Sequence, residues 1–267
     1  MARSTARIEL ENLALSQWGM FTAAQASAFG FRSNQIVRMV DSGRVEPRCY
    51  GVYRLTGGEE TPSADIKAAW LSLFPKKTAY ERLSARPFDA VVTGRTAAVL
   101  LGGGDFYAYP YCFIAPDKKT TKRQDIELIS APVDAGDVLM IETLPVACIE
   151  RTVVDLLRCN EDESLVCDFL RDMLMRFERP VDQERLAEFL SPLAQKRGFT
   201  RNDGAAYAQM LIRTAFDRSA RKGVGEALRS LMDKYREYSG VGEEGYDFFN
   251  DYILAPPGAE ETGKGER

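Results

Sequence analysis

Three polar side chains within five residues, Asn34, Gln35 and Arg38, have the chemistry needed to read the edges of DNA bases. An Asn or Gln amide can pair with adenine through two hydrogen bonds, and an Arg guanidinium can do the same with guanine. Each good pair contributes about 1–3 kcal/mol of discrimination against the wrong base. The same residue types also occur on ordinary solvated helix faces. The neighbouring secondary-structure elements are therefore needed to distinguish the two interpretations.

An apolar stripe predicts that these side chains lie on a helix over residues 33–42, with Ser33 as its N-cap. Ile36, Val37 and Val40 form the predicted buried face. The polar residues then point to the opposite side of the helix, where a duplex could reach them.

Two helical segments precede this helix, the first over residues 8–18. The second begins at Thr22, which has the spacing of a capping box with Gln25, and it ends near Ala28. Gly30 can adopt the left-handed conformation that terminates a helix. A short turn with a glycine between two capped helices is typical of a helix-turn-helix, although helical hairpins share this pattern.

Residues 44–55 predict a short β-hairpin with its turn at Gly51. Arginines are expected to line this hairpin, and a basic ribbon directly after a recognition helix is typical of a wing that grips flanking phosphates. The order of elements therefore predicts a winged helix-turn-helix in residues 1–58. Its candidate DNA-binding residues are Arg32, Ser33, Asn34, Gln35, Arg38, Arg44, Arg48 and Arg54.

The charge changes sign near residue 58. Residues 1–58 hold seven arginines and four carboxylates, which gives them a net charge of +3. Because the whole chain has a net charge of −4, the remaining residues carry −7. A basic module joined to an acidic body suits a nucleic-acid binder whose second domain does other work, because like charge keeps that body away from phosphates. Ordinary scatter of surface charge is the alternative interpretation.

The polar segment 56–63 predicts a domain boundary, and a second domain is expected over residues 59–254. We expect helices at 64–74 and 93–101, strands at 111–115, 126–130 and 138–141, and helices from residue 149 to about 235. Residues 255–267 are expected to be a disordered tail. The fold class is therefore α+β, with a small sheet and a helical C-terminal half in the second domain.

The chain contains no histidine, which excludes His-based catalytic triads and His-ligated metal sites. The five cysteines match no compact zinc or redox spacing and are interpreted as reduced thiols. Asp117, Asp125 and Glu127 with a lysine resemble the carboxylates of a metal-dependent nuclease, but the sequence has no Glu-x-Lys. We therefore expect no catalytic residue, metal or cofactor. Without an apolar run of membrane-spanning length or a secretion signal, a cytoplasmic location is expected.

Several segments together resemble AbiEi-type antitoxins, over roughly residues 8–240. Two of them, in the second domain, are similar to the family's helix and to its Pro-x-x-x-x-Glu-Arg-Thr segment. The resembling segments are Phe21–Gln25, Ser33–Ile36, Asp41–Val45, Tyr50–Leu55, Thr93–Gly102 and Leu144–Leu157.

The resemblance implies an antitoxin of a type IV toxin-antitoxin system. Its functional partner would be a nucleotidyltransferase toxin encoded beside it, and its winged module would repress its own operon by binding operator DNA. It does not imply direct contact with the toxin. Tyr50 stands where a basic residue often precedes Gly-Val-Tyr, so we expect a weaker grip on phosphate there. Two alternatives stay open: a metal-dependent nuclease targeted to DNA, and a ligand-responsive transcriptional regulator.

Overall fold

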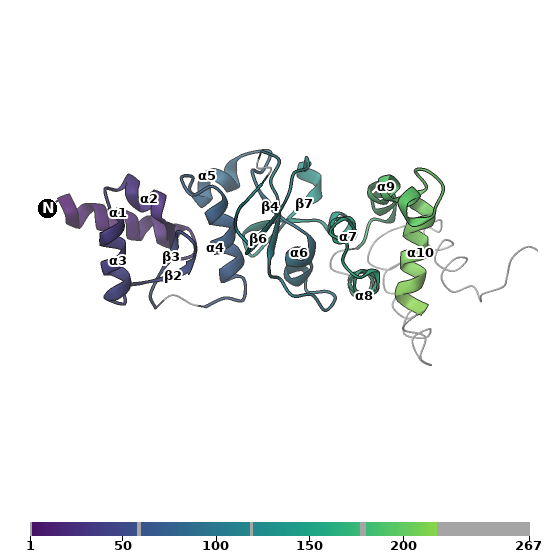
Figure 1. Ribbon diagram of the computed structural model, residues 1–267, viewed down its shortest axis with the longest axis horizontal. Coiled ribbons are helices and arrows are strands. Elements are labelled where there is room, and N and C mark those ends of the chain that lie inside the picture. The colour runs from purple at the N-terminus through teal and green to yellow at the C-terminus, as the bar shows by residue number, and fades with distance from the viewer. Residues whose placement is uncertain (1, 58–59, 118–119, 177–179, 218–267) are drawn as a thin grey trace, which may run out of the picture. The chain divides into compact units, whose positions relative to one another are not determined.

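The computed structural model describes residues 2–57, 60–117, 120–176 and 180–217 (Figure 1). Contacts between residues divide the chain into two units, of which the first joins the residues up to Gly102 with Phe106–Cys159. Helices and sheets are both present, which confirms the α+β prediction. The boundary expected at residue 58 falls inside the first unit and stays a prediction. No described helix is long and apolar enough to cross a membrane.

The N-terminal module, residues 2–57, has the predicted order of helix, helix, turn, helix and hairpin. Its antiparallel sheet has the strand order β1-β3-β2, and strand β1 was not predicted. Thr22 and Gln25 form the expected capping box, and Gly30 has φ +85° in the turn. The elements are α1 (Ala2–Ser16), β1 (Met20–Thr22), α2 (Ala23–Ala28), α3 (Ser33–Asp41), β2 (Val45–Cys49) and β3 (Val52–Leu55).

The rest of the first unit contains a five-stranded mixed sheet in the order β6-β5-β4-β8-β7. Strand β4 pairs in parallel with β8, and β5 in parallel with β6. The expected helices and strands between residues 64 and 141 are present, whereas α5, β4 and β8 were missed because such short elements show little periodicity. The elements are α4 (Ala64–Leu73), α5 (Ala79–Ser84), β4 (Val91–Val92), α6 (Gly94–Leu101), β5 (Tyr111–Ile114), β6 (Ile126–Ile129), β7 (Val138–Ile141), β8 (Leu144–Ala147) and α7 (Ile149–Arg158).

Helix α4 is buried around nearly its whole circumference, since it contacts all three strands of the small sheet and also strand β5 (Figure 1). Trp70 on α4 is fully buried, and its indole N–H donates to the Ala90 carbonyl at 3.0 Å. Trp18, at the end of the first helical segment, meets the Trp70 ring edge-on at 6.0 Å between centroids. Helix α4 therefore packs against both the small sheet of the N-terminal module and the larger sheet.

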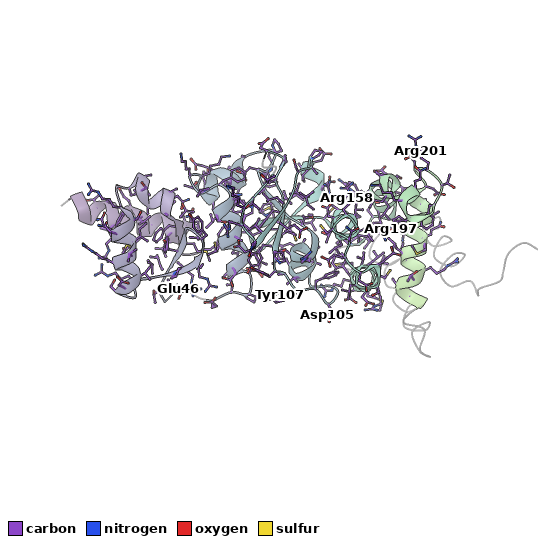
Figure 2. The ribbon with its side chains drawn as sticks, in the orientation of Figure 1. Glu46, Asp105, Tyr107, Arg158, Arg197 and Arg201 are labelled. Carbon is purple, nitrogen blue, oxygen red and sulfur yellow. The ribbon has the colours of Figure 1, made fainter. Side chains whose placement is uncertain are left out.

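The second unit is built from helices α8 (Glu163–Leu174), α9 (Gln183–Ala194) and α10 (Gly204–Asp217), with α10 packed against the other two. A Cβ at Gly204 would lie 1.9 Å from the Ala187 carbonyl oxygen, so only glycine permits this close crossing. Arg197, labelled in Figure 2, pairs with Glu163 at 3.1 Å. The helix expected to reach residue 235 and the tail at 255–267 extend outside the described residues.

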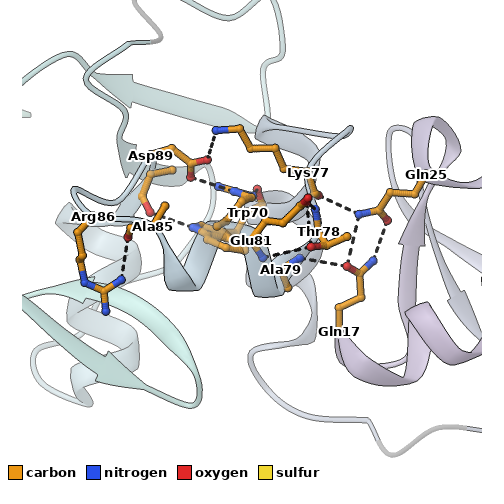
Figure 3. A network of polar contacts seen from close by, with 12 residues as sticks. Gln17, Gln25, Trp70, Lys77, Thr78, Ala79, Glu81, Ala85, Arg86 and Asp89 are labelled. Atoms are coloured by element: carbon orange, nitrogen blue, oxygen red, sulfur yellow. Dashed lines mark hydrogen bonds and ion pairs between the residues drawn. The ribbon is translucent and has the colours of Figure 1, made fainter. Parts of the chain in front are cut away.

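Two buried glutamines tie the N-terminal module to the segment that follows α4 (Figure 3). The Gln25 amide oxygen accepts from the Thr22 N–H at 2.9 Å, and its amide nitrogen donates to the Lys77 carbonyl at 2.9 Å. Gln17 donates to Gln25 at 2.7 Å and accepts from the Ala79 N–H at 3.2 Å. Because these groups are shielded from water, each depends on its protein partner.

We expect Gln25→Ala to lower the free energy of unfolding by about 2–4 kcal/mol, because it leaves the Thr22 N–H and Lys77 carbonyl without their buried partners. Urea unfolding followed by tryptophan fluorescence measures this loss. Gln35→Ala is the matched control: Gln35 holds the same capping position on α3, but at a more exposed site, and its loss should stay below about 1 kcal/mol. Equal losses in the two variants would contradict the prediction.

Candidate nucleic-acid interface

Helix α3 is seated in the N-terminal module by its apolar side. Ile36 and Met39 are buried in a cluster that also contains Leu10 of α1, Phe21 of β1 and Val45 of β2. The opposite side of α3 contains exposed residues that sequence analysis singled out: Arg32, Ser33, Asn34 and Arg38. The structure thus brings most of the predicted base-reading residues together on one accessible face.

Gln35 differs from its neighbours on α3. It is half-buried, and its amide oxygen accepts a hydrogen bond from the backbone N–H of Arg32 at 2.8 Å. Arg32 is the N-cap, so the prediction that Ser33 holds this position is wrong by one residue. Since paired recognition of adenine requires both the oxygen and the nitrogen of an amide, Gln35 in this conformation caps the helix and is not available to read a base.

The position of Val37 also differs from the prediction. Sequence analysis placed it in the buried stripe of the helix, but its side chain is 55% exposed. The core positions are taken instead by Ile36 and Met39, with Val40 half-buried beside them. Ile36, Met39 and Val40 lie within about 100° of one another around the helix, and Val37 lies beyond them at the edge of this arc, so a core centred on Ile36 and Met39 leaves it exposed.

The hairpin of β2 and β3 is short and held down at its tip. Cys49 pairs with Val52, so Tyr50 and Gly51 form a two-residue turn in which Gly51 has φ +73°. The Gly51 carbonyl accepts from the N–H of Ala23, the first residue of α2, at 2.8 Å. Tyr50 is 86% exposed at this tip. The predicted hairpin is confirmed, and its turn is tied to the body of the module.

Two of the three arginines predicted to line the hairpin are held in ion pairs, so they do not present free charge to solvent. Arg48 pairs with Asp65 of α4 at 2.6 Å and with Glu60 at 2.7 Å. Arg54 is buried and pairs with Glu46 at 2.6 Å and with Glu60. Figure 2 labels Glu46 of this group, which we call the wing clasp: Glu46, Arg48, Arg54, Glu60 and Asp65.

Three arginines remain on the outer side of the module. Arg32 at the start of α3, Arg38 on its second turn and Arg44 just before β2 are exposed, and their side chains have no ion pair or hydrogen bond within the part of the chain that the structure describes. The only carboxylate exposed on α3 itself is Asp41, in the last turn. Among the side chains of the module that the structure describes, the unpaired positive charge therefore lies at the start of α3, on its second turn and just after its end.

Asp155 of α7 joins the two segments beyond the N-terminal module that resemble the antitoxin family, Thr93–Gly102 and Leu144–Leu157. Its fully buried carboxylate accepts from the Thr93 hydroxyl at 2.7 Å and from Arg151 at 3.0 Å. Arg151 lies one turn before Asp155 on the same helix, whereas Thr93 comes from a distant part of the chain. The Thr-Gly-Arg and Glu-Arg-Thr segments therefore meet in one buried polar network that holds α6 and α7 in place.

Two of the three carboxylates considered for a nuclease are paired with arginines. Asp125 pairs with Arg123, and Glu127 lies 3.3 Å from Arg95. Among the described residues, no group of three His, Cys, Asp or Glu side chains could hold a metal ion. All five cysteines are free thiols, and burial raises the pKa of Cys112 to about 12, so this thiol stays protonated at neutral pH.

The helix order, the short hairpin and the exposed basic helix define the N-terminal module as a helix-turn-helix of the kind found in transcriptional regulators. Residues 9–56 match the model of a family described as a transcriptional regulator, AbiEi antitoxin, which confirms the resemblance for the segments within these residues. This is a family of regulators and not of enzymes. Residues beyond 56 lie outside the match. The resemblance of Thr93–Gly102 and Leu144–Leu157 stays a prediction.

One solved structure is similar over most of the chain. The crystal structure of RV2827C protein from Mycobacterium tuberculosis covers 76% of this chain and 78% of its own, with 15% sequence identity and a TM-score of 0.47. No curated protein matches the chain.

The ion pairs of the wing clasp lead us to expect that the free energy of unfolding depends on pH. The hydrogen bond from Arg48 lowers the pKa of Glu60 below its ordinary value of 4.5. Ionised Glu60 then stabilises the fold above about pH 4.5, and this contribution is lost as the pH falls through the lower folded-state pKa. Glu60→Gln should therefore be less stable than wild type at pH 7, and the difference should shrink as the pH falls below the ordinary value of 4.5 and through the lowered pKa of Glu60.

Thermal unfolding at a series of pH values measures this effect, which should be small because the Glu60 side chain is exposed. Glu9→Gln, which removes an exposed carboxylate from α1, is the control. A Glu60→Gln difference that persists unchanged at low pH would count against the assignment to the ion pair.

Proposed function

We propose that this protein represses transcription from its own promoter by inserting α3 into the major groove of operator DNA. The proposal rests on one observation. Asn34 and Arg38 are exposed on α3, and the unpaired Arg32 and Arg44 flank this helix and are also exposed. The residues at the start of a recognition helix contact base edges, while flanking cations contact phosphates.

The residues of this surface have separate proposed roles. Asn34 and Arg38 read bases, since their side chains suit adenine and guanine in the major groove. Arg32, Arg44 and the Ser33 hydroxyl contact the phosphate backbone and position the helix. Gln35 supports this surface by capping α3. Arg48 and Arg54 are left out of the proposed contacts because carboxylates already neutralise them.

A titration of the full chain against DNA from upstream of its own gene tests the proposal. With three free arginines at the phosphates and groove, log affinity should fall with log salt at a slope of about −3. Arg38→Ala should reduce the preference for the operator over unrelated DNA by about tenfold, the value of one base contact of about 1–3 kcal/mol. Lys76→Ala, an exposed cation between α4 and α5, is the control and should leave both quantities unchanged. An absence of binding, or binding without salt dependence, would reject the proposal.

A second test compares alanine variants of two arginines, Arg44 and Arg48. Arg44 is exposed and unpaired, so Arg44→Ala should weaken binding to every sequence and bring the salt slope from about −3 to about −2. Arg48 is held by Asp65 and Glu60, so Arg48→Ala should leave the slope near −3. The outcome that would contradict this division is an equal change in slope for both variants.

We extend the proposal to an antitoxin of a type IV system, which counteracts a nucleotidyltransferase toxin encoded beside it. The match of residues 9–56 to a family of antitoxin regulators supports this extension. The regions beyond the N-terminal module would provide the antitoxin activity, with the module serving repression. No direct contact with the toxin is part of the proposal.

Co-expression with the neighbouring gene tests the antitoxin. The full chain, produced from an independent promoter, should restore growth that the neighbouring gene arrests. Arg38→Ala should restore growth equally well, because its defect is confined to operator recognition. If the wild-type chain gives no rescue, the antitoxin role is wrong while repression can still stand.

A further inference from the structure

Val37 is the large apolar side chain that α3 leaves exposed. The other apolar residues of this helix, Ile36, Met39 and Val40, are buried or half-buried, whereas Val37 is 55% exposed. An isolated apolar side chain on a surface is common and by itself needs no explanation. Its position between the proposed base-reading residues gives it a specific meaning.

Val37 lies three residues after Asn34 and directly before Arg38. Residues three apart on a helix lie on the same side, one turn above each other, so Val37 and Asn34 are neighbours on the exposed surface. Both are exposed, as is Arg38. All three belong to the first two turns of α3, which is the part of a recognition helix that reaches the bases.

We infer that Val37 contacts the C5 methyl group of a thymine and so makes α3 selective for a T·A pair beside the bases read by Asn34 and Arg38. The inference rests on the proposed function. In the major groove thymine presents one apolar group, its methyl, which apolar side chains contact. Cytosine and uracil present no such group at that position.

The surroundings of Val37 favour DNA over a protein partner. Arg38 directly follows Val37, and Arg32 and Arg44 flank the two ends of α3; these arginines are exposed, and their charge complements phosphates. The apolar surface exposed on α3 is a single valine, which is too small for the apolar core of a stable protein interface of about 800 Å² per partner. A thymine methyl, in contrast, is matched in size to one valine side chain.

Substitution of thymine by deoxyuridine tests the contact, because it removes the methyl group and leaves base pairing intact. The site in the upstream DNA is first located by footprinting, and duplexes are then made with each thymine singly replaced. For the full wild-type chain, we expect an affinity loss of about fourfold at one thymine in each recognised half-site, the value of one buried methyl. Val37→Ala should bind the unmodified duplex about fourfold more weakly, and deoxyuridine at that position should cause it no further loss.

Leu15→Ala is the matched control, since Leu15 is an apolar residue of α1 with 70% exposure and lies away from α3. This variant should keep the full sensitivity to deoxyuridine. The inference is overturned if no thymine shows the loss, if Val37→Ala keeps it, or if Val37→Ala changes only the oligomeric state. Failure of the wild-type chain to bind any unmodified duplex would instead reject the proposed function, so the two failures are distinguishable.

Discussion

The burial of helix α4 on two sides is the constraint on which the arrangement of the first unit depends. A helix that is apolar around most of its circumference must be covered on more than one face. The small sheet of the N-terminal module covers one side of α4, and the five-stranded sheet contributes to the cover of the other. Each sheet thus completes the core of the other, and the contact between them is continuous packing, not a tether.

This packing decides which arginines of the module are free. The side of the small sheet that faces α4 meets Asp65 and the connecting residue Glu60, and the arginines directed there are neutralised. The opposite side of the sheet supports α3, where Arg32 and Arg38 remain unpaired. The net charge of +3 counted along residues 1–58 therefore describes the binding surface poorly, because Arg7, Arg48 and Arg54 are each paired with carboxylates. Charge counts become informative only when pairing is known.

The fold of the N-terminal module was predictable because each of its boundaries has a local cause. A capping box at Thr22, a left-handed glycine at position 30 and a two-residue turn at Gly51 each act within four residues. Strand β1, with three residues, has no such signal and exists because β3 provides its partner. Tertiary pairing of this kind is invisible to a reading of periodicity.

Two of the errors at the site have the same origin, whereas the third, at Gln35, has a local cause. Nothing in the sequence around Arg48 indicates that Asp65, seventeen residues later, will hold it. Val37 has the residue type of a core position, and only the direction of the core, set by Ile36 and Met39, shows that it faces solvent. Gln35 has the chemistry of a base reader, yet its spacing from Arg32 is that of a capping box, a signal that was present in the sequence and was overlooked.

The polar contacts that join the module to the segment after α4 affect how a duplex could approach. Gln17, Gln25 and Trp18 fix the module to the segment after α4 and to the β7–β8 turn, where the Trp18 indole N–H donates to Thr143 at 2.7 Å. Helices α3 and α4 lie on opposite sides of the small sheet (Figure 1). A duplex seated on α3 is therefore separated from the carboxylates of the wing clasp by the thickness of that sheet. Because electrostatic interaction is screened over about 8 Å in physiological salt, these carboxylates oppose binding far less than their number implies.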